Sequence, residues 1–214
     1  MELPEAKKLF GNNFIGPAEL NKIGSVLNIG EFAEENGNIP PIGFSDEILK
    51  KNAGDSILIL GAPFHKDGSK LNIKSLREIF GLDPAKNEPC FYNQDWYLGQ
   101  KFFEETLENK WYLIKRGVAE DSRAKNPEDL VNKMAKNENL PSAILTALVF
   151  FANYLLNKEI LWKHDFIWCA DTDFNGDRIY TGRYVDPDGK NKNGFNIHRH
   201  LKLRPCYGVV TEIS

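Results

Sequence analysis

Residues 165–184 read Asp165-Phe-Ile-Trp-Cys-Ala-Asp-Thr-Asp-Phe-Asn-Gly-Asp-Arg-Ile-Tyr-Thr-Gly-Arg-Tyr184, and this stretch decides the fold of the C-terminal part of the chain. Two β-prone runs flank the dipeptide Asn175-Gly176, which is typical of a tight hairpin turn. If these two residues form the turn, the facing pairs are Asp173 with Arg178, Asp171 with Tyr180, and Phe166 with Val185. Both faces of residues 166–170 are apolar, which predicts an interior strand of a sheet.

The rest of the chain carries mainly helical patterns. Capping residues and apolar periodicity predict helices over residues 17–27, 46–53, 73–80, 95–107 and 143–156, and strands over residues 56–60 and 111–114. The segment Asn126-Pro-Glu-Asp129 predicts the start of a further helix. The sequence therefore predicts an α+β fold, in which helices from the middle of the chain pack on a mainly antiparallel C-terminal sheet that the two earlier strands join.

The domain organisation is suggested by one segment near the N-terminus. Residues 30–43 contain several glycines and the pair Pro40-Pro41, which is typical of a linker or an extended arm. We therefore expect residues 1–43 to form an N-terminal arm with a short helix, and residues 44–214 to form a single α+β domain.

The composition excludes some protein classes. The 214 residues are 42% hydrophobic and 12% aromatic, and their net charge of −3 points to no particular partner. Three widely spaced cysteines, Cys90, Cys169 and Cys206, indicate reduced thiols rather than a disulfide framework. The apolar residues 143–156 are too short a run to cross a bilayer. With no secretory signal at the N-terminus, we expect a soluble cytoplasmic protein that does not bind a membrane.

Two motifs give a family resemblance. The segment Lys110-Trp-Tyr-Leu-Ile-Lys115 and the hairpin motif Asp-x-Asp-x-Asn-Gly-Asp at residues 171–177 resemble those of a family of uncharacterised bacterial proteins. The resemblance covers roughly the last three quarters of the chain. It implies a shared fold and a bacterial origin, and it transfers no activity because that family has no assigned function.

The hairpin motif also matches the first half of a calcium loop, with oxygen ligands at Asp171, Asp173, Asn175 and Asp177. The twelfth loop position, where a bidentate Glu belongs, is Gly182. We therefore favour a turn in which Asp and Asn side chains bind local backbone amides, and expect no cofactor. A weak Ca²⁺ or Mg²⁺ site on these four residues is the alternative.

Residues 190–204 are the one strongly basic stretch, with five basic residues, two His and no acid. Strand alternation places Arg199 on an apolar face, where a guanidinium needs a carboxylate, and Asp165, Asp171 and Asp173 are the candidates. His198 and His200 share the polar face, as a solvated strand surface or as part of a metal pair. The candidate anion-binding residues on this strand are Lys192, Arg199, Lys202 and Arg204.

Two functions of different classes fit these patterns. The first is a non-catalytic binding or structural module, whose basic C-terminal strand could meet an anionic ligand. The alternative is a metal-assisted hydrolase that combines Asp171, Asp173 and Asp177 with His198 and His200, which requires the turn and the later strand to converge. Sugar or nucleobase binding on exposed Trp and Tyr faces also stays open.

Overall fold

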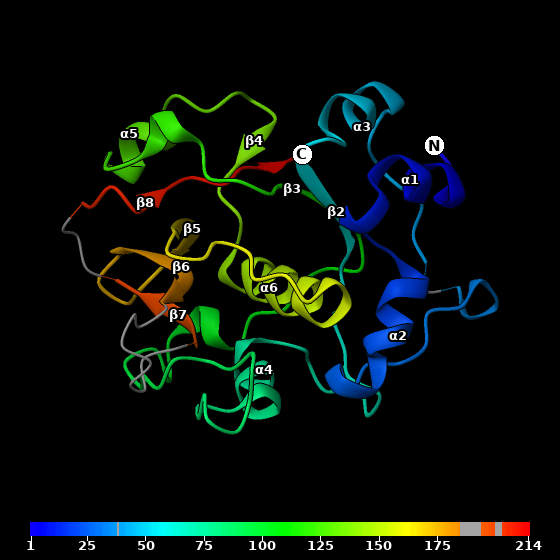
Figure 1. The fold of residues 1–214 in the computed structure, drawn as a ribbon, viewed down its shortest axis with the longest axis horizontal. Coiled ribbons are helices and arrows are strands. Elements are labelled where there is room, and N and C mark those ends of the chain that lie inside the picture. The colour runs from blue at the N-terminus through cyan, green and yellow to red at the C-terminus, as the bar shows by residue number, and fades with distance from the viewer. Residues whose placement is uncertain (38, 185–193, 200–202) are drawn as a thin grey trace.

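The computed structural model describes residues 1–37, 39–184, 194–199 and 203–214. The fold is α+β, with two sheets that share a hydrophobic core around one apolar helix (Figure 1). Within the described residues, no helix combines the length and apolar character that crossing a bilayer requires.

The first sheet is built from segments that lie far apart in the sequence. Its strand order is β1 (Phe14–Ile15), β2 (Ser56–Leu60), β3 (Trp111–Lys115), β9 (Glu212–Ile213) and β4 (Glu138–Asn139). The pair β1–β2 is parallel, and the other pairs are antiparallel. Every residue of β2 is buried, as the apolar run that follows Ser56 predicts for an interior strand.

The second sheet has the order β7 (Gly194–His198), β6 (Arg178–Tyr184), β5 (Phe166–Thr172) and β8 (Tyr207–Gly208). It is mainly antiparallel, with only β5–β8 parallel. The prediction that β5 is an interior strand is confirmed, because β6 and β8 flank it. The predicted strands at 56–60 and 111–114 exist, but they belong to the first sheet, so the prediction that they join the hairpin sheet is wrong.

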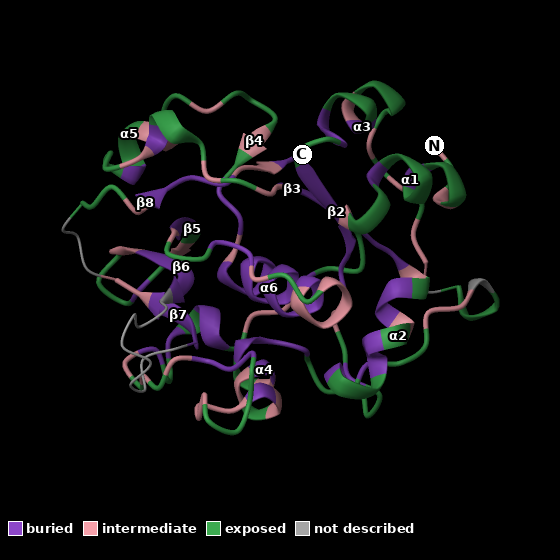
Figure 2. Cartoon of the chain, viewed as in Figure 1, coloured by how far each residue is buried: buried purple, intermediate pink, exposed green. Residues whose placement is uncertain are grey.

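Helix α6 (Ala143–Asn157) lies at the centre of the molecule, between the strands of the two sheets in the view of Figure 1. Its residues 143–153 are all buried, including Thr146 and Asn153. Figure 2 shows this burial beside the less buried helices α3 (Asp46–Asn52) and α5 (Pro127–Val131). The apolar sequence of α6 therefore indicates a helix at the centre of the core.

The N-terminal segment is integrated into the main core. Helices α1 (Leu3–Phe10) and α2 (Pro17–Leu27) bury Phe10, Leu20 and Leu27 in the same cluster as β2 and α6, and β1 pairs with β2. The segment expected to be an arm thus supplies both a strand and core side chains.

Local capping signals correctly located helix α4 (Ile73–Phe80). The side chain of Asn72 accepts a hydrogen bond from the Ser75 N–H at 2.9 Å, and Gly81 ends the helix at φ +67°. The predicted helix over residues 95–107 is wrong. Only a short 3₁₀ turn, Lys101–Phe103, forms there, because Gly99 has φ +85°, which a continuous α-helix does not allow.

Candidate functional site

The hairpin tip, residues 172–178, joins β5 to β6 through a three-residue turn. Thr172 faces Arg178 across the two strands. The Gly176 N–H donates to the Asp173 carbonyl at 3.0 Å, and the Asp173 N–H donates to the Asp177 carbonyl at 2.9 Å. Gly176 has φ +83°, in the left-handed region that a glycine adopts at little cost. This is a turn closed by a bulge at glycine, the usual three-residue hairpin connection.

The predicted two-residue turn is therefore wrong, and its register fails with it. A further bulge between Trp168 and Thr172 shifts the pairing again, so that Phe166 faces Gly182 and Trp168 faces Tyr180. The predicted pairs that these replace are Asp173 with Arg178, Asp171 with Tyr180, and Phe166 with Val185. An Asn-Gly dipeptide fits both turns, because each needs a left-handed residue at the glycine.

Asp173 is the structural centre of the hairpin tip. Its side chain is fully buried, and its Oδ1 accepts hydrogen bonds from the N–H groups of Asn175 at 2.8 Å and Asp177 at 3.0 Å. Its Oδ2 accepts from Nη1 of Arg199 at 2.8 Å. Burial alone would raise the pKa of Asp173, but the hydrogen bonds from Arg199 and the two amides outweigh it and lower the pKa. The carboxylate is thus ionised and fixes the turn.

Arg199 connects this turn to the neighbouring loop. It forms the ion pair with Asp173, and its guanidinium carbon lies 4.8 Å from the ring centroid of Trp96. The indole N–H of Trp96 donates to the Ile197 carbonyl at 2.9 Å, which fixes the ring against β7. The prediction that Arg199 needs a carboxylate partner is confirmed, and Asp173 is that partner.

Asp171 has a separate role from Asp173. Its Oδ2 accepts a hydrogen bond from the Ala143 N–H at 2.6 Å, at the first turn of α6. Burial raises the pKa of Asp171, and the negative charge of Glu105 adds to this, while the Ala143 N–H acts in the opposite direction. The carboxyl group therefore joins β5 to the N-terminus of the central helix.

The predicted cation ligands have separate partners. Asp171 is bound to α6 and Asp173 to Arg199, while the side chain of Asn175 is exposed and that of Asp177 is half-buried. Among the residues that the structure describes, no group of three or more His, Cys, Asp or Glu side chains could hold a metal ion. A weak Ca²⁺ or Mg²⁺ site at this turn stays a prediction that titration must test.

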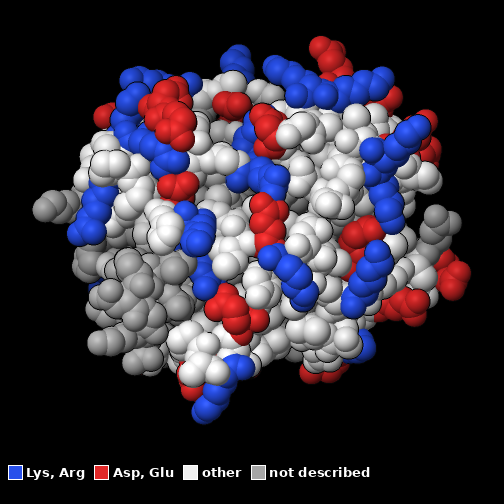
Figure 3. Space-filling view, viewed as in Figure 1, with Lys and Arg blue, Asp and Glu red and all other residues white. Residues whose placement is uncertain are grey.

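The basic strand is described only in part. His198 stacks on Tyr180 with ring centroids 5.5 Å apart, and its Nδ1 accepts a hydrogen bond from the Arg199 N–H at 3.0 Å. Arg204 is exposed. The predicted residues His200, Lys192 and Lys202 lie outside the described residues, so both the His pair and the anion site stay predictions. On the face shown in Figure 3, basic and acidic side chains are interspersed.

Sequence reasoning missed Phe174, the residue that the hairpin tip exposes. It is 72% exposed, more than the other large hydrophobic side chains that are exposed in the described chain. Its N–H donates to Oε1 of the buried Gln100 at 3.0 Å, so the tip is anchored on this side as well. An apolar residue at a turn position between Asp and Asn was the only signal in the sequence.

A recess of about 520 Å³ adjoins the hairpin tip on the side of Gln100. It is lined by Lys70, Gly99, Gln100, Lys101, Glu104, Glu105 and Thr106. Lys101 and Glu105 form an ion pair at 3.3 Å across its exposed surface. The recess therefore offers polar groups of both charges, and Gln100 links it to the backbone of Phe174.

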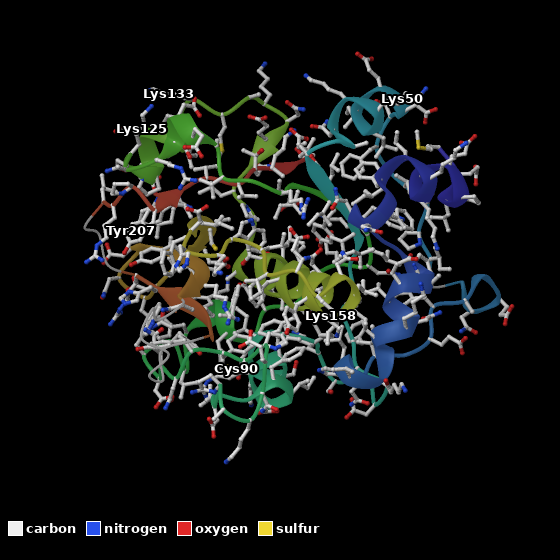
Figure 4. All side chains as sticks on the ribbon, in the orientation of Figure 1. Lys50, Cys90, Lys125, Lys133, Lys158 and Tyr207 are labelled. Carbon is white, nitrogen blue, oxygen red and sulfur yellow. The ribbon has the colours of Figure 1, made fainter. Side chains whose placement is uncertain are left out.

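Two of the three thiols are inaccessible. Cys90 and Cys169 are buried, Cys206 is half-buried, and all three carry thiols rather than disulfides. Burial raises the pKa of Cys90 to about 11 and that of Cys169 to about 12, so neither is a ready nucleophile. In Figure 4, Cys90 lies on the chain beside α4.

Comparison of the chain with models of known protein families, with curated proteins and with solved structures finds no match. The resemblance to an uncharacterised bacterial family therefore stays a prediction.

Proposed function

We propose that this chain is a non-catalytic binding module that docks on a partner protein through Phe174. The observation that carries the proposal is the combination of an exposed aromatic ring and a fixed backbone beneath it. Phe174 is 72% exposed, while Asp173 and Gln100 hold the turn by hydrogen bonds on both sides. Burying such a ring contributes about 1.5–3 kcal/mol.

Rigidity of the tip favours this role. A preorganised turn loses little conformational entropy when a partner binds, so more of the burial energy appears as affinity. Leu98, which is 43% exposed, belongs to the same loop as Gln100 and adds apolar surface. The polar recess with Lys101 and Glu105 would form the rim, as in interfaces where polar groups surround an apolar centre. The partner should therefore present an apolar pocket edged by polar groups.

The proposal includes a cytoplasmic location in a bacterium. Three free cysteines support a reducing compartment, and the resemblance of the hairpin and the Trp-Tyr-Leu-Ile strand supports the bacterial origin.

Selection of short peptides tests the proposal without a known partner. A displayed random peptide library would be selected on immobilised wild-type protein. Soluble Phe174→Ser protein would be added as a competitor, to remove peptides that bind outside the hairpin tip. Selected peptides should bind the Phe174→Ala protein at least about tenfold more weakly, the loss of a binding hot spot.

Phe64 provides a matched control because it is 53% exposed in a different loop. Phe64→Ala should leave the dissociation constant of the selected peptides unchanged, and both variants should keep the wild-type melting temperature because neither ring is buried. If selection yields only peptides that bind the Phe174→Ala protein as tightly as wild type, the proposal is wrong.

A further inference from the structure

A groove of about 460 Å³ lies beside α5, and none of the described residues that line it belongs to the hairpin tip. One wall comes from α5 and the residues that flank it, and the other from the C-terminal segment that includes Leu203, Val209 and Thr211. Its volume is within the range of small-molecule sites. Figure 4 shows Lys125 and Lys133 on the α5 side, above Tyr207.

Charged side chains of both signs line this groove. They are Lys125, Lys133, Asp121, Asp129 and Glu138. Among the ion pairs of the described residues, none involves any of these five side chains. By contrast, Glu128 on α5 is paired with Arg178 at 2.6 Å. Glu138 accepts a hydrogen bond from the Ala135 N–H at 3.4 Å, and the other four charged groups have no ion-pair partner among the described residues. A groove with such groups of both signs suits a ligand that carries both charges.

The floor of the groove separates it from a buried aromatic cluster. Leu130, Met134 and Val209 line the groove, and the same three side chains belong to or pack against the second core cluster. The aromatic members of that cluster are Phe166, Trp168, Tyr180 and Tyr207. Leu130, Met134 and Val209 therefore connect the groove to the packing around these rings. Met134 is unbranched and half-buried, so it can be displaced with little strain.

Trp168 gives this cluster an unused hydrogen-bond donor. The residue is fully buried, and its Nε1 has no hydrogen-bond partner among the described residues. Its ring meets Tyr180 edge to face, with centroids 5.1 Å apart and planes at 82°, which offers the N–H at most a weak π acceptor. The hydroxyl of Tyr180 donates instead to the hydroxyl of Tyr207, at 3.2 Å. A buried donor without a partner is uncommon and marks a place where a ligand acceptor would be favoured.

We infer that the α5 groove binds a small zwitterionic ligand with an aromatic ring, and that an acceptor atom on this ring displaces Met134 and receives the Trp168 Nε1 hydrogen bond. The ring is held by the aromatic cluster, while Lys133 and Asp129 contact the opposite charges. A site that hydrogen-bonds a ligand group discriminates strongly against the analogue that lacks it. The class that fits is a free or peptide-linked aromatic amino acid with a ring hydroxyl.

Two dipeptides distinguish this proposal from a merely apolar groove. The tryptophan indole N–H resonances of the full chain would be followed by NMR, with the Trp168 resonance identified by its loss in Trp168→Phe. Glycyl-tyrosine should shift this resonance saturably, and glycyl-phenylalanine should bind at least about tenfold more weakly. Equal binding of the two dipeptides, or the absence of a saturable shift, would overturn the inference.

Exposed variants provide controls that keep the fold intact. Lys133→Ala should weaken glycyl-tyrosine binding several-fold, because it removes a charge contact and no buried group. Phe174→Ala should leave glycyl-tyrosine binding unchanged, so failure at the groove and failure at the hairpin tip are separate results. An unchanged affinity in Lys133→Ala would contradict the charge contact and with it the proposed ligand class.

Discussion

Replacement of Asp173 measures how much one buried carboxylate contributes to the hairpin. Asp173→Ala removes the acceptor of three hydrogen bonds, from the N–H groups of Asn175 and Asp177 and from Arg199. Breaking a buried ion pair by removing one partner typically costs about 3–5 kcal/mol. The Arg199 side chain is 33% exposed and can recover water, so we expect a loss of about 2–4 kcal/mol in the free energy of unfolding at pH 7.

Asp173→Asn separates the role of the charge from that of the acceptor. The amide oxygen can still accept from the two backbone N–H groups, so only the interaction with Arg199 is lost, and we expect a cost of about 1–2 kcal/mol. The pKa of Asp173 is lowered in the folded protein. The charge therefore contributes stability that is fully present above the unfolded pKa of about 3.9 and is lost as the pH falls through the folded pKa. The difference between wild type and Asp173→Asn should shrink as the pH falls below about 4.

The assay is urea unfolding, followed by circular dichroism and tryptophan fluorescence at several pH values. Asp129→Ala is the control, since Asp129 is exposed and in no ion pair of the described residues, and it should change stability by less than about 0.5 kcal/mol. A cost below about 1 kcal/mol for Asp173→Ala would refute the reasoning. An Asp173→Asn cost equal to that of Asp173→Ala would show that the backbone bonds contribute nothing.

Three further predictions concern the core, the thiols and Asp171. Leu148→Ala should cost about 2–5 kcal/mol in urea unfolding, because Leu148 is fully buried on α6, and a cost below about 1 kcal/mol would contradict its burial. With a thiol reagent at pH 8, Cys206 should label first, and Cys90 and Cys169 only on unfolding; fast labelling of all three would show that the core opens readily. The raised pKa of Asp171 means that its ionisation weakens the fold as the pH rises through the folded pKa. Asp171→Asn keeps an acceptor for the Ala143 N–H and should have a slightly higher urea midpoint than wild type at pH 7. The two midpoints should be equal at pH 3. A midpoint below that of wild type at pH 7 would contradict a destabilising charge at Asp171.

The sequence alone determined those features whose causes are local. Ser45, Asn72 and Asn126 cap the helices that follow them, because a capping side chain bonds to an amide two or three residues away. The central position of α6 followed from its apolar composition around the whole helix. The need of Arg199 for a carboxylate followed from strand alternation, which is also a local rule.

Only the tertiary structure decided which segments pair and where each polar group finds its partner. β2 pairs with β3, and β3 with the last residues of the chain rather than with the hairpin sheet, because partner choice depends on which buried faces pack together. The Asn-Gly turn takes three residues instead of two, and in that turn Asp173 accepts hydrogen bonds from two backbone amides and from Arg199. The same contacts leave Phe174 in solvent, and long-range contacts of this kind leave no periodic pattern in a sequence.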